Sequence, residues 1–303
     1  MKIINRIITE ISNAKKLAVA ARKGIKSETD SVEFSKNMTK REKLKTLLKP
    51  FILGLDKQTV KSLHKIKDKM EFVKASSKVI LEKKGIPEGL RPAIGLDVNE
   101  SLPPAALACY SKDFNMVIVS PKVLKKPKSA IFSASAHELK HFAQNIDIIR
   151  TEGLGEKAVK SYAKVQAEAY GKIFDNTYQN MSMAEIQKLY KQGVFSEQGL
   201  QVIAGYKKAQ SEGEAASGKY LKMLYEGDFA NFHAQWKNIR QKAADSLGII
   251  KKDSPQAALS ERHLNEFNNT SQDEQHYWNS SAEKTAYAQG LVAQLEYLWR
   301  RFF

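Results

Sequence analysis

A chain of 303 residues is long enough for one large domain or two ordinary ones with a sizeable hydrophobic core. Its hydrophobic content of 42% and charged content of 27% exclude a disordered or fibrous protein. The only cysteine, Cys109, excludes an intramolecular disulfide framework and a zinc site built from several thiolates. A metal ion in this protein would therefore be held by histidines and carboxylates, and there are six histidines.

The net charge of +16 is concentrated in the first part of the chain. Residues 1–90 hold 22 lysines or arginines against 10 aspartates or glutamates, which gives this part a net charge of +12. Such a positive field favours an anionic partner, such as nucleic acid or an anionic membrane. Only three of those 22 are arginine, the residue best suited to bidentate contacts with phosphate. Lysines that solvate the surfaces of helices are the alternative interpretation.

The N-terminal segment is predicted to form an amphipathic helix over about residues 1–25, because isoleucines at positions 3, 4, 7, 8 and 11 follow helical spacing. Arg6, Glu10 and the pair Lys15-Lys16 interrupt the apolar run that a signal peptide would need. No stretch approaches the roughly 18 consecutive apolar residues that a membrane span requires. We therefore expect a cytoplasmic location without a transmembrane segment, with secretion by a non-classical route as the alternative.

Helical spacing continues from Asp56 to about Lys84, where Gly85 and a following proline end a predicted single helix. Three short strands are predicted next, over residues 92–98, 105–110 and 115–120. The last of these is β-branched and compact, with polar residues on both sides, as in a hairpin strand. These strands form the only β region that the sequence predicts.

The rest of the chain is predicted to be helical. A helix is expected from about Ser129, its N-cap, to Ile149. Several helical stretches are expected over residues 155–250, one of them ending near residues 226–228. Residues 251–280 are polar and predicted to be a loop, and a last helix is expected over 281–300.

These elements predict an α+β fold that is mostly helical, with a small three-stranded sheet. We divide the chain into a basic helical region, residues 1–55, and a main domain, residues 56–303. The main domain is predicted to contain a helical insertion over about residues 155–265.

One motif carries chemistry, namely His137-Glu138-Leu139-Lys140-His141. Residues four apart lie on one face of a helix, so the two imidazoles can bind a single ion. Glu138 is rotated away from that ion and can reach a water molecule beside it. Zinc would lower the pKa of that water to about 7, and the glutamate would accept its proton and then protonate the leaving amine. The sequence therefore predicts His137 and His141 as zinc ligands and Glu138 as the general base.

A hydrolytic zinc site needs a third protein ligand, and three residues are candidates. Asp147 has the spacing of a ligand that follows a glycine turn, but Gln144 stands where the glycine would be, so the helix continues and Asp147 points away. Glu168 lies on the next predicted helix. Glu283 opens the last predicted helix, in which small residues at 286 and 290 would allow a close approach to the motif.

The order of these features resembles the gluzincin branch of the zincin zinc metallopeptidases, especially small bacterial and phage members. The resemblance rests on a hairpin before the HExxH helix and on a later helix with the pattern Glu-x-x-Ala-Tyr, residues 283–287, and covers roughly fifty residues. It implies a zincin-like core in which His137, His141 and Glu283 bind zinc and Glu138 is the general base. The chain departs from that family in the 141 residues between His141 and Glu283, which keeps Glu168 open as the alternative ligand.

Peptidases of this kind also need a donor for the oxyanion that forms on the scissile carbonyl. His276 and Tyr277, close to Glu283 in the sequence, are the candidates. The leading expectation is a zinc-dependent metallopeptidase that binds a protein or peptide substrate in extended form along an edge strand of the hairpin. The alternative is a basic helical protein that binds nucleic acid or an anionic membrane and has a non-catalytic zincin-like scaffold.

Overall fold

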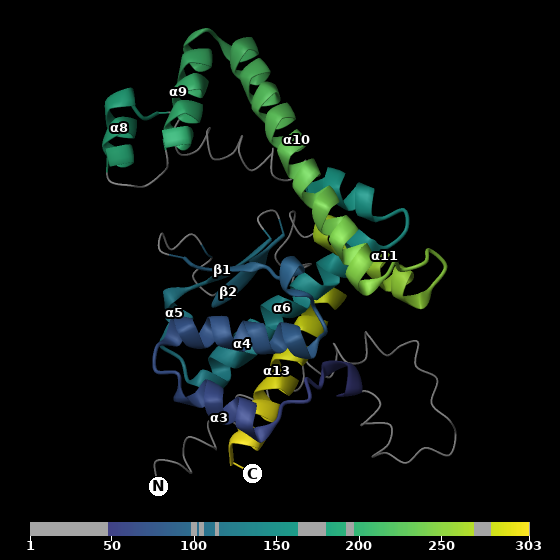
Figure 1. The fold of residues 1–303 in the computed structure, drawn as a ribbon. Helices are drawn as coiled ribbons and strands as arrows, with labels where there is room; N and C mark the ends of the chain where they lie inside the picture. The colour runs from purple at the N-terminus through teal and green to yellow at the C-terminus, as the bar shows by residue number, and fades with distance from the viewer. Residues whose placement is uncertain are drawn as a thin grey trace. The chain divides into compact units, whose positions relative to one another are not determined.

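The structure is a computed structural model (Figure 1), and the residues it describes are 48–97, 102, 106–112, 115–162, 180–191, 197–269 and 280–302. Most of them are helical, and the described strands form one small sheet, which confirms the predicted α+β, mostly helical class. The chain divides into two compact units. Unit 1 comprises residues 1–155 and 240–303, and unit 2 comprises residues 156–239.

Unit 1 contains the sheet, whose strands are β1 (Ala93–Leu96), β2 (Ala108–Ser111) and β3 (Met116–Val119). Strand β3 lies in the centre, parallel to β1 and antiparallel to β2. The predicted hairpin is thus β2–β3, and its turn includes Asn115 with a positive φ of 45°. Val117 and Val119 of β3 face the core, and β2 is an edge strand that packs against a long helix, α6.

Two long helices form the centre of unit 1, namely α6 (Lys128–Arg150) and α13 (Ser281–Phe302). They share the most extensive contact between any two described elements (Figure 1). They approach closely at Gly290, where an added Cβ atom would lie 2.9 Å from the carbonyl oxygen of Ser133 and 3.5 Å from Cβ of His137. The sequence prediction that small residues let these helices approach closely is confirmed at this position.

We predict that Gly290→Ala destabilises the protein by about 1 to 3 kcal/mol, because the new methyl group would press on the backbone of α6. Gly89→Ala is the matched control, since a Cβ atom there meets nothing within 4 Å. The control is expected to stay within about 0.5 kcal/mol of the wild type. Urea denaturation of both variants measures the difference, and equal stabilities would contradict the close packing.

Hydrogen bonds between side-chain carboxylates and backbone groups connect helix α13 to the rest of unit 1 at two points. At its N-terminus, the carboxylate of Glu266 on α11 (Pro255–Asn269) accepts hydrogen bonds from the backbone N–H and hydroxyl of Ser281 and from the N–H of Ala282, at 2.9 to 3.0 Å. Further along, the Glu296 carboxylate accepts hydrogen bonds from the backbone N–H groups of Leu53 and Leu55 at 2.9 and 2.6 Å. Carboxylates near a helix N-terminus also interact favourably with the helix dipole. The start of α13 is therefore held in place by α11.

The single helix predicted over residues 56–84 is wrong, because the chain breaks into α3 (Lys57–Lys65) and α4 (Lys69–Lys83). Asp68 caps the second helix by accepting a hydrogen bond from the N–H of Glu71 at 2.7 Å. Lys128 donates hydrogen bonds to the backbone carbonyls of His64 and Ile66 at the end of the first. The break therefore depends on a local cap and on a lysine distant in the sequence.

Three other boundaries differ from the prediction. Helix α11 replaces part of the loop predicted over residues 251–280. The long helix α10 (Glu214–Leu247) runs through residues 226–228, because a single glycine there is tolerated in a helix. Helix α6 begins at Lys128 with Pro127 before it, and no side chain caps its N-terminus, so Ser129 is not an N-cap.

The remaining described elements are short or belong to unit 2. In unit 1 they are η1 (Lys49–Phe51), η2 (Glu88–Leu90) and α5 (Pro121–Leu124). Unit 2 contains α8 (Met183–Lys191), α9 (Glu197–Ser211) and the first part of α10, with a small core around Ile186, Ile203 and Tyr206. Among the described helices, none is long and apolar enough to cross a membrane. Residues 1–47 of the predicted basic region lie outside the described residues.

Candidate metal centre

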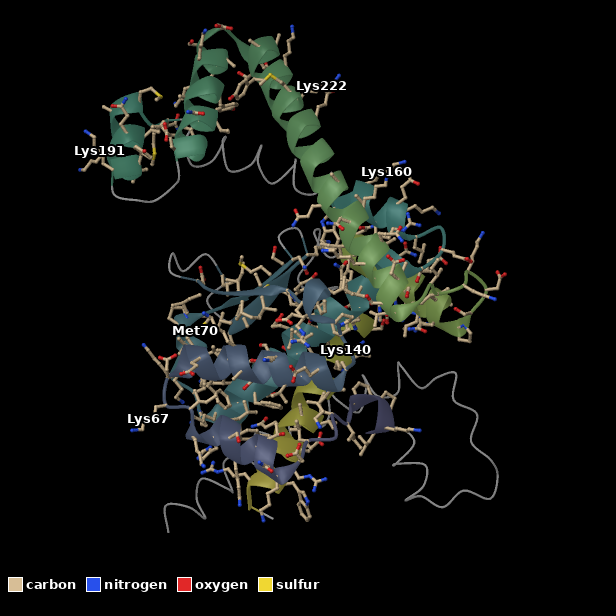
Figure 2. The ribbon with its side chains drawn as sticks, viewed as in Figure 1. Lys67, Met70, Lys140, Lys160, Lys191 and Lys222 are labelled. Carbon is tan, nitrogen blue, oxygen red and sulfur yellow. The ribbon has the colours of Figure 1, made fainter. Side chains whose placement is uncertain are left out.

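The two histidines of the motif lie one turn apart on α6, on the side that faces α13. Their Nε2 atoms are 3.3 Å apart, and their rings meet in a T-shaped arrangement with centroids 4.9 Å apart. Lys140, between them in the motif, marks this part of α6 in Figure 2. The helical spacing that predicted a shared ligand position therefore does bring both imidazole nitrogens to one point.

Glu283 comes from the first turn of α13 and meets both imidazoles. Its Oε1 atom lies 3.2 Å from Nε2 of His137, and its Oε2 atom lies 2.9 Å from Nε2 of His141. The side chain is only 2% exposed, and Oε2 makes no hydrogen bond to any described group despite the short contact. A buried carboxylate oxygen without a hydrogen bond is unusual, and a cation bound between these groups would explain it.

The electrostatics of the cluster couple these groups. Burial acts to raise the pKa of Glu283, but the positive charge and hydrogen-bonding capacity of His141 and His137 outweigh it and lower that pKa well below its usual range. Burial acts to lower the pKa of His141, but the Glu283 carboxylate outweighs it and raises that pKa. Both directions show that negative charge on Glu283 and positive charge beside it stabilise each other. The same arrangement would stabilise a bound cation.

Glu138 lies beside this cluster and is held by the sheet. Its Oε2 atom accepts a hydrogen bond from the backbone N–H of Tyr110 in β2 at 2.8 Å. Its Oε1 atom lies 3.9 Å from Nε2 of His137. Tyr110 is itself fixed, because its hydroxyl accepts a hydrogen bond from the Asn145 amide at 3.0 Å and lies 3.2 Å from the side-chain oxygen of Asn115. One carboxylate oxygen is thus tied to the edge strand, and the other points toward the two imidazoles.

Either glutamate could complete a three-residue metal site. The ligand atoms of His137, Glu138 and His141 lie within 4.8 Å of one another. Glu283 fits better, because its carboxylate approaches both imidazoles more closely than the 3.9 Å that separates Glu138 from His137. Glu138 also has one oxygen engaged by a backbone N–H. We therefore regard Glu283 as the third candidate ligand and Glu138 as a neighbour of the ion.

The other residues weighed from the sequence lie elsewhere. Asp147 forms an ion pair with Arg150 at 3.0 Å on the continuing helix α6, so it does not join the cluster. Glu168, His276 and Tyr277 lie outside the described residues, so their predicted roles as alternative ligand and oxyanion donors stay predictions.

Gln144 connects the motif to α13, a role that sequence reasoning missed. Its Oε1 atom lies 3.1 Å from Nδ1 of His141. Its Nε2 atom donates hydrogen bonds to the carbonyl oxygen of Ala282 at 3.1 Å and to the hydroxyl of Thr285 at 2.7 Å. All of these groups are buried. The only sequence signal was its position three residues after His141, on the same face of the helix.

Aromatic rings flank the two imidazoles. The ring centroids of Tyr287 and His137 are 4.6 Å apart, and those of Phe267 and His141 are 6.4 Å apart. Burial and the carboxylates of Glu283 and Glu138 raise the pKa of Tyr287 well above its usual value, so its hydroxyl stays protonated. The imidazoles therefore occupy a partly apolar environment, in which charges interact more strongly than in water.

His263 on α11 is a second buried imidazole near this cluster. It is 3% exposed, and its Nε2 atom has no hydrogen-bond partner among the described groups. Burial, followed by the positive charges of Lys140, His141 and Arg262, lowers the pKa of His263 to about 3. The folded protein therefore keeps this ring neutral at a pH where the unfolded chain would protonate it.

We predict that His263 makes the protein less stable in mild acid. Below pH 6.5, His263 binds a proton in the unfolded chain but stays neutral in the folded protein. The free energy of unfolding therefore falls as the pH decreases toward about 3. The loss is expected to be on the order of 1 kcal/mol per pH unit. His263→Phe removes this contribution, so its advantage over the wild type should grow from pH 7 to pH 4 in chemical denaturation. Parallel pH profiles for the two proteins would contradict the prediction.

Comparisons with known family models, with curated proteins and with solved structures found no match to this chain. The chemistry of the site is therefore argued from its own geometry.

Proposed function

We propose that His137, His141 and Glu283 bind a zinc ion in a zincin-like core. The observation that carries this proposal is the convergence of two imidazole nitrogens and one buried carboxylate on a single point. Two histidines and a glutamate form one of the ligand sets found in hydrolytic zinc sites, with a fourth position left for water. The buried Oε2 atom of Glu283, which lacks a hydrogen bond, fits a metal ligand.

The distances support zinc. Bonds of about 2.0 to 2.2 Å to a tetrahedral zinc ion separate its ligand atoms by about 3.3 to 3.6 Å. The two imidazole nitrogens are 3.3 Å apart, and Oε1 of Glu283 is 3.2 Å from one of them. The remaining contact, 2.9 Å between Oε2 of Glu283 and Nε2 of His141, is shorter and would lengthen if an ion bound between the two atoms. The groups therefore need little movement to surround the ion.

We further propose that the site hydrolyses peptide bonds. A bound zinc ion would lower the pKa of a water molecule to about 7 and polarise the scissile carbonyl. Glu138 would accept a proton from that water while the oxygen of the water attacks the carbonyl carbon. It would then deliver the proton to the leaving nitrogen. The hydrogen bond from Tyr110 fixes Oε2 of Glu138, so Oε1 is the oxygen available for this proton transfer.

The outer edge of β2 supports a peptide as the substrate. Toward β3, the carbonyl of Leu107 accepts a hydrogen bond from the N–H of Ser120. On the opposite edge of β2, the N–H of Tyr110 donates a hydrogen bond to Glu138. Because backbone groups alternate along an antiparallel strand, Ala108 directs its N–H and carbonyl toward the same outer edge. An extended peptide paired with this edge would run past Glu138. The strand would then place a peptide bond close to the proposed zinc ion.

Metal analysis tests the zinc proposal directly. Purified wild-type protein is expected to hold about one zinc ion, His137→Ala almost none, and His64→Ala, which removes a histidine from α3, as much as the wild type. Near-zero zinc in all three proteins would overturn the proposal. If zinc is present, incubation with a peptide library tests hydrolysis, and the absence of any cleavage would reduce the site to a non-catalytic scaffold.

The charge of the N-terminal part supports a second proposal, that this region binds nucleic acid or an anionic membrane. Residues 1–90 carry +12, and exposed lysines such as Lys67 point outward from unit 1 (Figure 2). Binding of this type should weaken steeply with salt. Its test is binding to DNA, RNA and anionic vesicles at about 50 mM and 200 mM salt, and absence of binding at the lower salt would reject it.

A further inference from the structure

We propose that Gln144 is a positioning residue that fixes the tautomer of His141 and joins the two ligand-bearing helices. This inference rests on the proposed function, because it describes how the chain prepares one imidazole for a metal ion. The polar atoms of Gln144 are buried between α6 and α13, where each meets a partner from the site or its supporting turn.

The hydrogen bonds determine which way the Gln144 amide points. The carbonyl oxygen of Ala282 can only accept a hydrogen bond. The hydroxyl of Thr285 already donates its proton to that same carbonyl at 2.9 Å, so it too can only accept from Gln144. The end of the Gln144 amide that faces these two acceptors must therefore be its NH2 group. Its nitrogen lies 3.1 Å from the carbonyl oxygen of Ala282 and 2.7 Å from the hydroxyl oxygen of Thr285. The amide oxygen is left facing His141.

This orientation determines the protonation of His141. An amide oxygen accepts hydrogen bonds and cannot donate, so Nδ1 of His141 must carry a proton, 3.1 Å from Oε1 of Gln144. In the neutral ring, Nε2 then has the lone pair, and Nε2 is the atom that faces Glu283 and His137. A hydrogen bond to the distal N–H also makes an imidazole a better metal ligand. Whenever the ring of His141 is neutral, Gln144 therefore leaves Nε2 without a proton and able to bind an ion.

The same side chain also ties the helix of the motif to the start of α13. Ala282 and Thr285 flank Glu283, so the two hydrogen bonds from Gln144 hold the turn that positions the third candidate ligand. The cap from Glu266 holds that turn from α11, and Gln144 holds it from α6. Two functions, tautomer control and helix docking, thus belong to opposite ends of one amide.

Two substitutions separate these functions. Gln144→Met keeps the length of the side chain but removes both the acceptor for Nδ1–H of His141 and the donor to the start of α13. Zinc affinity is therefore expected to fall about 10- to 100-fold, and the metal-free protein is expected to unfold at a lower temperature. Gln144→Glu keeps an acceptor for Nδ1–H but loses the donor, so it should lower the unfolding temperature while keeping zinc affinity within about tenfold of the wild type. Affinity is measured by competition with a chromophoric chelator, and unfolding by circular dichroism of the metal-free proteins.

Two further variants complete the design. Thr285→Val removes one of the two groups that accept a hydrogen bond from Gln144. It should lower the stability of the protein with little change in zinc affinity. Gln241→Leu removes an exposed glutamine, bonded to Asp245 on α10, and should change neither. Wild-type zinc affinity in Gln144→Met would overturn this inference alone, as would equal losses of affinity in Gln144→Glu and Gln144→Met. A wild-type protein that binds no zinc would overturn the proposed function and this inference with it.

Discussion

Glu138→Gln is expected to lower peptide hydrolysis by about 10²- to 10⁴-fold, the usual contribution of a general base. The amide oxygen can still accept the hydrogen bond from Tyr110, so the side chain should keep its position in the site. It has no basic oxygen to accept a proton from water, which is why the chemical step should slow. Zinc content should remain at the wild-type level, because Glu138 is not one of the three proposed ligands.

The measurement is the rate of cleavage of the best library peptide at saturating concentration, with zinc content determined on the same preparation. Glu261→Gln is the matched control, since Glu261 is an exposed glutamate on α11 outside the site. Full activity in Glu138→Gln would contradict the assigned role. Loss of zinc from that variant would instead indicate that Glu138 is a ligand. Its Oε1 atom is 3.9 Å from Nε2 of His137, so a small shift of the side chain would bring it to an ion bound there.

Glu283→Ala is expected to lower zinc affinity by more than about 100-fold, since losing an outer hydrogen-bonding partner of a ligand alone costs about 10- to 100-fold. The substitution removes one of three donor groups and the only one of them that is negatively charged. It also removes the carboxylate that raises the pKa of His141, so protons should compete less strongly for that ring. The loss of affinity should therefore persist at high pH, where fewer protons compete with zinc for His141.

Isothermal titration of metal-free protein with zinc at pH 7 and pH 8.5 measures this effect. Glu296→Ala is a demanding control, because Glu296 lies on the same helix and is also hydrogen-bonded, but to Leu53 and Leu55. It is expected to lose stability and keep its zinc affinity. Wild-type affinity in Glu283→Ala would contradict the ligand assignment and return Glu168 to consideration.

The part of the site that lies within one helix could be predicted from the sequence. Helical periodicity alone places His137 and His141 together, and Gln144 in place of a glycine correctly predicted that α6 continues past Asp147. The close approach of α13 could also be predicted, because Gly290 leaves no side chain between the helices. The first two of these conclusions depend on spacing along a single helix, which a sequence displays directly, and the third depends on the small size of one residue.

The long-range parts could not be predicted, because they depend on side chains that meet only after folding. Nothing near Glu266 in the sequence indicates that it caps α13, and nothing near Lys128 indicates that it ends α3. The choice between Glu168 and Glu283 was open for the same reason, since a helix presents a ligating glutamate and a solvated one with the same local pattern. The structure places Glu283 at the imidazoles, whereas residue 168 lies outside the described residues.

The position of Glu283 on α13 has a consequence for the order in which the site forms during synthesis. A ribosome makes the motif of α6 first and adds 141 residues before it reaches Glu283, which takes on the order of ten seconds at ordinary rates of elongation. Until then the nascent chain carries His137, His141 and Glu138 but lacks the buried carboxylate of Glu283 and the turn that Gln144 and Glu266 hold. If the proposed chemistry is correct, the growing chain is protected from its own peptidase activity, because the last ligand arrives only after most of the chain has been made.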